Sequence, residues 1–258
     1  CFIPLIPSFI LFIFFLCLFA CRRTNIHADQ HVTLKAIVME PGPGFSGGPP
    51  ESFYLTGLML GDTAAMTVGS RCRNTEVQRI LLATNLITAA GANALAELLP
   101  TVPQLAELDL HNNSIGGAGA QMLAQALPHC NLVRLGLSCN DLRDEGARAL
   151  AVALRANPPL AQLLIHTNNI AAEGAAALAG ALPFAPRLTS LHLSANPIQA
   201  AGAAALAAAL GANPSLQVVS DHNRALLLAF LMMLAVDAGE CRGRGRRSHG
   251  TGGGAARQ

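Results

Sequence analysis

The side chains best suited to chemistry in this chain of 258 residues are three histidines and one cysteine in its central part. His111, His166 and His192 lie beside short runs of alternating apolar residues, and Cys139 occupies a related position. Imidazole and thiolate are common ligands of Zn²⁺, and a cysteine beside a histidine can act as a nucleophile with its base. These residues raise two hypotheses, a metal site and a catalytic cysteine.

The spacing of these residues argues against both hypotheses. We expect His111 and His166 to lie two strands apart in a sheet, which is about 10 Å at the usual strand spacing. One ion binds nitrogen at about 2.0–2.1 Å, so the pair is too far apart to share it. Cys139 is one position out of their row, and nothing nearby orients a base. We therefore predict no catalytic residue, no metal and no cofactor.

The composition and the other motifs exclude further classes. A hydrophobic content of 52% rules out disorder throughout, and seven scattered cysteines do not form a disulfide scaffold. The sequence contains no GxxxxGK[ST], no CxxC and no HExxH. Residues 42–48 are glycine-rich but lack lysine, and the basic residues 242–247 form a short tail. With a net charge of +2, we do not expect nucleic acid as a partner.

The elements that carry the histidines are internal repeats. Five segments share the frame LxxLxLxxNxIxxxGxxxLAxAL, in which alternation predicts a short strand and the later spacing predicts a helix. We expect the shared asparagine to satisfy backbone groups where each strand ends, as a structural ladder. We also expect Asp144 to cap the helix of the third repeat. The ladder residues are Asn85, Asn113, Asn140, Asn168 and Asn196.

This frame resembles the 28-residue leucine-rich repeat of the ribonuclease-inhibitor class, which nucleotide-binding leucine-rich-repeat receptors and Ran GTPase-activating proteins also contain. The resemblance implies an α/β solenoid with parallel strands on the concave face of an arc and helices on the convex face. Spacing leads to the same arc, because strands stack at about 4.8 Å and helices pack at about 8–10 Å.

The chain divides into six parts by composition. They are an apolar segment (1–20), a disordered linker (21–50), an N-terminal cap or degenerate repeat (51–76), five repeats with the start of a sixth (77–217), a C-terminal capping helix (218–240) and a disordered basic tail (241–258). Within 51–76, Leu55, Leu58 and Leu60 fit the frame of a vestigial repeat, with Thr63 at the asparagine position.

The predicted function is that of a non-enzymatic scaffold or recognition module that binds a protein partner and is itself a monomer. In a solenoid of this kind, binding falls to side chains that flank the buried strand leucines. The five repeats offer no aromatic residue there and few arginines, although both types dominate protein interfaces. The predicted binding residues are Arg79, Glu107, Asp109, His111, Arg134, Gln162, His166 and His192.

Two alternative functions stay open. The resemblance to Ran activators implies stimulation of a GTPase, although this chain has a basic tail and about half their repeats. A membrane-tethered receptor fragment requires residues 2–20 to span a bilayer, for which their length suffices. That segment also fits a signal peptide or a mistranslated leader. Unpaired cysteines and the resemblance favour a cytoplasmic location over secretion, with any anchor holding the repeats on the cytoplasmic side.

Overall fold

The computed structural model describes residues 52–73, 76–210, 213, 215, 216 and 218–220. Within these residues, short strands alternate with helices along the chain. The strands are β1 (Ser52–Tyr54), β2 (Arg79–Leu81), β3 (Glu107–Asp109), β4 (Arg134–Gly136), β5 (Gln162–Leu164), β6 (Ser190–His192) and β7 (Val218–Ser220). The helices are α3 (Asp62–Arg71), α4 (Ala89–Leu98), α5 (Gly116–Ala126), α6 (Arg143–Arg155), α7 (Ala172–Ala181) and α8 (Gln199–Leu210).

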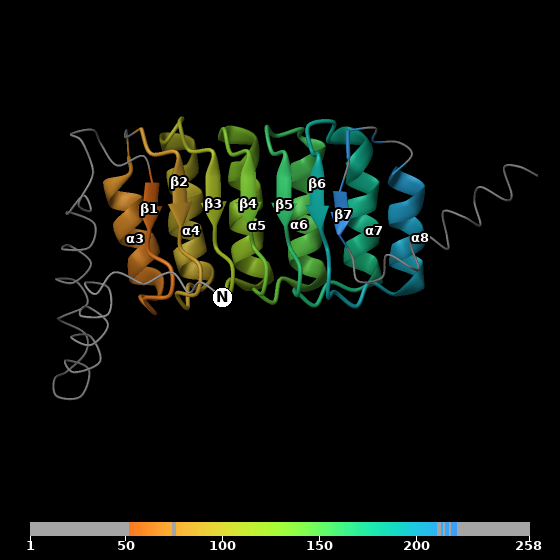
Figure 1. The fold of residues 1–258 in the computed structure, drawn as a ribbon, viewed down its shortest axis with the longest axis horizontal. Coiled ribbons are helices and arrows are strands. Elements are labelled where there is room, and N and C mark those ends of the chain that lie inside the picture. Colours follow the sequence, from red (N-terminus) through yellow and green to blue (C-terminus); the bar gives the residue numbers. More distant parts are fainter. Residues whose placement is uncertain (1–51, 74–75, 211–212, 214, 217, 221–258) are drawn as a thin grey trace, which may run out of the picture. The chain divides into compact units, whose positions relative to one another are not determined.

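The strands form one parallel sheet in chain order, from β1 to β7. Each strand pairs with the next in the same register, so Arg134 of β4 pairs with Gln162 of β5, and Gln162 pairs with Ser190 of β6. Figure 1 shows the strands in one layer and the helices in a second layer beside it. This arrangement confirms the predicted α/β leucine-rich-repeat solenoid.

The core lies between the two layers and consists of the residues that the frame repeats. Leu108 and Leu110 of one unit, and Leu135 and Leu137 of the next, are fully buried. Burying a leucine side chain contributes about 1.5–3 kcal/mol, and one unit has no partner for its apolar side until the next unit stacks on it. Stability therefore comes from stacking.

The glycine of each frame lies where a helix meets the preceding helix. A Cβ atom on Gly119 would lie 3.1 Å from the Cα of Ala89, and a Cβ on Gly202 would lie 2.9 Å from the Cβ of Ala175. Both distances are shorter than ordinary carbon contacts. The frame therefore keeps glycine, and alanines opposite it, because neighbouring helices approach closely at this point.

Helix capping corrects one prediction from the sequence. Asp144 lies in the first turn of α6, but its Oδ1 accepts hydrogen bonds from the N–H groups of Ala171 and Gly174, at 2.8 and 2.9 Å. Those groups belong to the start of α7, so Asp144 caps the next helix and not its own. Asp62 of α3 does the same for α4, where its Oδ1 accepts from Thr88 and Gly91. Each cap thus links two repeats.

The N-terminal unit corrects a second prediction. The sequence placed Thr63 at the asparagine position, whereas Ser52 pairs with Arg79, which puts Leu58 there. The N–H of Leu60 accordingly faces Oδ1 of Asn85 at 3.4 Å, as the N–H of Ile87 faces Asn113 one repeat later. The strand–helix unit of β1 and α3 precedes the five repeats in the same sheet.

At the C-terminal end, residues 218–220 form strand β7, where the sequence predicted the start of a capping helix. This strand belongs to the sixth unit that Leu216 opens. The rest of that helix prediction, the apolar segment 1–20, the linker 21–50 and the tail 241–258 lie outside the described residues. Across the part of the chain that is described, no helix is both long enough and apolar enough to cross a bilayer.

Candidate protein-binding surface

Three rows of side chains cross the strands on the side of the sheet away from the helices. Register aligns one residue from each strand, and alternate residues point to this side. We call these rows the strand face, on which all eight predicted binding residues lie. The first row is Ser52, Arg79, Glu107, Arg134, Gln162 and Ser190; the second is Tyr54, Leu81, Asp109, Gly136, Leu164 and His192; the third is Ala83, His111, Ser138, His166 and Ser194.

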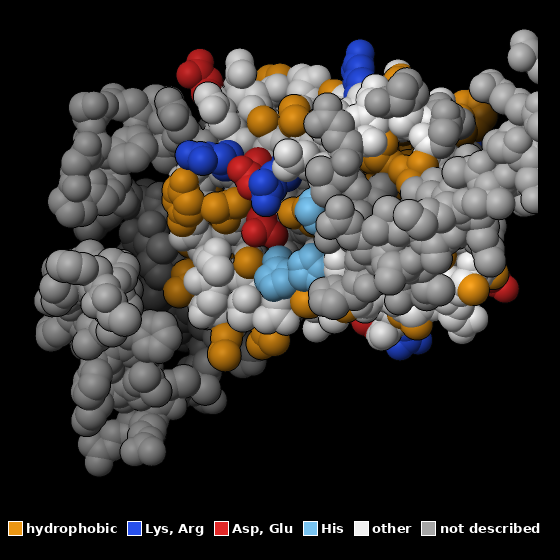
Figure 2. All heavy atoms as spheres, turned by 45° about the vertical axis from the view of Figure 1, so that its right-hand side comes forward, with side chains coloured by type: hydrophobic (Ala, Val, Ile, Leu, Met, Phe, Trp, Pro, Cys, Tyr) orange, Lys and Arg blue, Asp and Glu red, His pale blue; other side chains and the backbone are white. Residues whose placement is uncertain are grey.

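The arginines of the first row each contact a neighbour in that row. Arg134 Nε lies 3.2 Å from Glu107 Oε1, and Arg134 Nη1 donates to Gln162 Oε1 at 3.3 Å. Arg79 Nε donates to Ser52 Oγ at 3.0 Å. These groups are partly exposed, so each contact contributes at most about 1 kcal/mol to stability. Their effect is to hold the row in one arrangement. Figure 2 shows basic, acidic and histidine side chains gathered on one side of the molecule.

The second row contains a glycine, Gly136, and an exposed aromatic residue. Gly136 has no side chain, and Asp109 fills that space, with its Oδ1 only 2.6 Å from where a Cβ would lie. The same oxygen accepts the N–H of His111 at 3.0 Å. Tyr54 on β1 is 61% exposed. Sequence reasoning missed this tyrosine, because it found no aromatic residue in the five repeats and treated 51–76 as a cap.

The third row contradicts the distance predicted between two histidines. The ring centroids of His111 and His166 are 5.5 Å apart, with the rings tilted by 46°. Their strands flank β4, so the two rings approach each other across Ser138, whose small side chain leaves room. The expected 10 Å holds for the backbone spacing. It fails for the side chains because they lean together.

Among the histidines of the strand face, His166 is affected by its surroundings. Burial, followed by the neighbouring His111 and His192, lowers the pKa of His166 below its ordinary value. The lowered pKa favours the neutral form of the His166 ring. Its Nδ1 lies 3.3 Å from Thr167 Oγ1, and His192 Nε2 lies 2.8 Å from Ser190 Oγ. Among the described residues, no three His, Cys, Asp or Glu side chains are placed to hold one metal ion.

The repeated asparagines form a ladder beneath the end of the strands. Asn168 shows the pattern: its Oδ1 accepts the N–H of Asn140 at 2.9 Å, and its Nδ2 donates to the carbonyl of Leu137 at 2.9 Å. Asn196 repeats both contacts one unit later, with the N–H of Asn168 and the carbonyl of Ile165. These amides thus satisfy buried backbone groups of the preceding unit, and Asn168 is fully buried.

The residue before each ladder asparagine has a left-handed backbone. These residues are Thr84, Asn112, Cys139, Thr167 and Ala195, with φ between 54° and 59°. A left-handed residue turns the chain out of the strand, which brings the asparagine amide under the sheet. The same turn places Cys139 outside the rows of the strand face.

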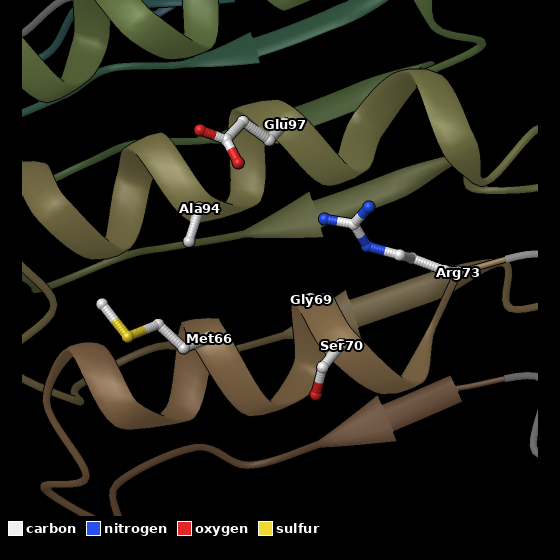
Figure 3. A pocket seen from close by; sticks show the side chains of 6 residues that line it. All are labelled: Met66, Gly69, Ser70, Arg73, Ala94 and Glu97. Atoms are coloured by element: carbon white, nitrogen blue, oxygen red, sulfur yellow. The ribbon is translucent and has the colours of Figure 1, made fainter.

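On the helix side, an open groove lies between α3 and α4. Its lining includes Met66 and Gly69 of α3, Arg73 just after that helix, and Glu97 of α4 (Figure 3). One acidic and one basic side chain beside a methionine do not define a ligand of one chemical class. The groove therefore does not change the choice of the strand face as the candidate site.

Comparisons with known proteins agree with this fold. The Leucine Rich repeat family profile matches residues 105–124, 129–151 and 186–207. NACHT, LRR and PYD domains-containing protein 5 of Homo sapiens is 35% identical over 44% of this chain and 10% of its own length. Ribonuclease inhibitor of Sus scrofa is 33% identical over 41% of this chain and 24% of its own length.

The alignments therefore span less than a quarter of each of these two relatives. The solved actin-binding site 2 of leiomodin-1 aligns with 59% of this chain and 94% of its own, at 21% identity and a TM-score of 0.49. The three profile matches fall on the second, third and fifth of the five units that carry the repeat frame. The matched segments of this chain are thus similar to leucine-rich repeats, among them those of ribonuclease inhibitor.

Proposed function

We propose that this protein is a non-enzymatic recognition module that binds a protein partner on its strand face. The observation that carries this proposal is a row of charged and amide groups on the sheet, in which Glu107, Arg134 and Gln162 contact one another, with Tyr54 exposed on the first strand of the neighbouring row. Side chains ordered before binding lose less conformational entropy when a partner docks. A polar surface with few aromatic and arginine side chains is similar in character to non-obligate protein interfaces.

Within this surface, Tyr54 and Arg134 are the proposed anchors. Tyrosine and arginine supply most hot spots in protein interfaces. Tyr54 lies at the start of the second row beside Leu81, and Arg134 sits at the centre of the first row. Their separation along the sheet fits a partner that lies across several strands.

Site-specific photo-crosslinking tests the proposal. A photoreactive phenylalanine analogue replaces Leu164 on the strand face in one version of the full chain, and Val152 on α6 in a second. Val152 is 71% exposed and faces away from the sheet, which makes it the matched control. We expect one protein to crosslink from position 164 and not from position 152, and Tyr54→Ala to weaken its binding by about 30-fold, the effect of a typical hot spot.

Equal crosslinking of that protein from both positions, or unchanged binding after Tyr54→Ala and Arg134→Ala together, would refute the proposal. If the purified chain instead accelerated GTP hydrolysis by a small GTPase, that result would support the Ran-activator alternative. The monomeric state and the cytoplasmic location remain predictions from the sequence.

A further inference from the structure

Two potential metal ligands on the strand face, His111 and His166, lie close together. Their rings lie 5.5 Å apart, centroid to centroid, although their strands are separated by β4. Two imidazoles bound to one tetrahedral ion with bonds of about 2.0–2.1 Å have ring centres roughly 5 Å apart. The pair is therefore spaced for one shared ion without movement of the backbone.

The residue between the two histidines supplies a second, independent observation. Ser138 is 2% exposed, and its Oγ is the buried side-chain oxygen that lacks a hydrogen-bond partner among the described residues. A buried hydroxyl without a partner costs about 1–3 kcal/mol. Ser138 shares the row of both rings, so its side chain lies on the side of the sheet where they meet. A water molecule bound to an ion there would satisfy it.

The neighbouring groups leave this pair free to bind. Nδ1 of His166 faces Thr167 Oγ1, which leaves Nε2 of that ring for a ligand. Such a contact on the other ring nitrogen is the usual way proteins orient a metal-binding histidine. Asp109 accepts the backbone N–H of His111, and His192 contacts Ser190, so both are engaged elsewhere. The described residues offer no third His, Cys, Asp or Glu for the set.

We propose that His111 and His166 form a two-histidine site for Zn²⁺ on the strand face, completed by water, with Ser138 Oγ as hydrogen-bond partner of a bound water. Nitrogen ligands suit Zn²⁺, and water can fill a coordination position that the protein leaves open. The proposal is independent of the identity of any protein partner. It reverses the expectation from the sequence that no metal binds.

Calorimetric titration of the metal-stripped full chain with Zn²⁺ at pH 7.4 tests this site. Two variants remove one ligand each, His111→Gln and His166→Gln. His129→Gln is the matched control, because His129 is an exposed histidine of the same repeat region outside the strand face. Cys139→Ser controls for the nearby thiol. We expect one Zn²⁺ per chain, affinity reduced at least tenfold in each ligand variant, and unchanged affinity in both controls.

A melting temperature measured with and without Zn²⁺ separates loss of the site from loss of the fold. A folded ligand variant melts at the wild-type temperature without metal but gains no stabilisation when Zn²⁺ is added. Unchanged Zn²⁺ binding in both ligand variants would overturn the proposal, and so would the absence of any binding at millimolar Zn²⁺. Loss of binding in Cys139→Ser alone would also overturn it, because the thiol would then be the ligand.

Discussion

At the scale of single residues, the asparagine ladder carries more of the fold than any other polar group. An amide of the ladder can serve two units at once: Asn168 accepts from the N–H groups of Asn140 and Leu142 in the preceding unit, and its amide nitrogen donates to carbonyls of the preceding unit and of its own. A buried backbone group that loses its partner costs about 1–3 kcal/mol, so the loss of one rung affects several groups together.

Removal of one rung provides the first prediction. Asn168→Ala leaves the N–H of Asn140 and the carbonyl of Leu137 without this partner. We expect the free energy of unfolding to fall by about 3 kcal/mol. Urea denaturation measures it, with Asn93→Ala as the control, since Asn93 lies on the exposed side of α4 and contacts only Glu97 there. Equal losses of unfolding free energy in both variants would show that the ladder asparagine stabilises the fold no more than an exposed asparagine does.

The reactivity of Cys72 provides a second prediction at this scale. Burial raises the pKa of the Cys72 thiol to about 12, and its side chain is fully buried. Thiolate is the reactive form, so folded Cys72 has almost none at pH 8. We expect iodoacetamide to label the half-exposed Cys139 in the native protein and to label Cys72 only after denaturation. Peptide mass spectrometry gives the two rates, and comparable native rates would contradict the burial of Cys72.

At the scale of the elements, contacts between repeats add to what each helix sequence specifies. Asp144 belongs to α6 yet caps α7, and Gly174 of α7 packs against α6. A Cβ on Gly174 would lie 2.5 Å from Asp144 Oδ1 and 2.9 Å from Ala147 Cβ. The helix cap and the close packing contact between α6 and α7 therefore both involve Gly174.

Two glycines in α7 separate the effect of this junction from helix propensity. Gly174→Ala adds a methyl group at the junction, and we expect a loss of about 1–3 kcal/mol in unfolding free energy. Gly180→Ala adds the same group where the nearest atom is 3.6 Å away. That change should increase stability by about 0.5–1 kcal/mol, because alanine favours helix. Thermal melting of both variants gives the sign, and a matching sign would contradict the packing described.

The sequence predicted these elements where its frame was strong and failed where side chains act across units. Strands and helices of the five repeats follow from the spacing of leucine, asparagine and glycine. The target of Asp144 lies 27–30 residues away, in the next repeat, so local helix rules could not identify it. Tyr54 was missed because binding residues were sought only in the five repeats, and 51–76 was interpreted as a cap or degenerate repeat. The meeting of His111 and His166 depends on the directions of side chains, which spacing does not encode.

At the scale of the whole molecule, no unit stands alone. Leu135 in the central unit is fully buried between its neighbours. A disturbance there therefore affects both halves of the stack, as nearest-neighbour coupling in repeat proteins requires.

The central unit provides the last prediction. Leu135→Asp buries a carboxylate without a partner, which costs several kcal/mol. We expect the variant to lose its single cooperative melting transition, observed by circular dichroism. Val133→Asp is the control two residues away, because Val133 is 43% exposed and should keep wild-type melting. If the Leu135→Asp variant melted like the wild type, the assignment of Leu135 to the core would be wrong.

The repetition of one strand register along the sheet has a consequence for how such a molecule can change length. Residues 79, 107, 134, 162 and 190 occupy equivalent places at successive junctions, and each junction reuses the same glycine-to-alanine contact. The junctions therefore share the same strand register and the same helix contact. Duplicating one whole unit in the gene would insert a new layer whose two surfaces already fit, so this architecture can grow or shrink by single steps without redesign.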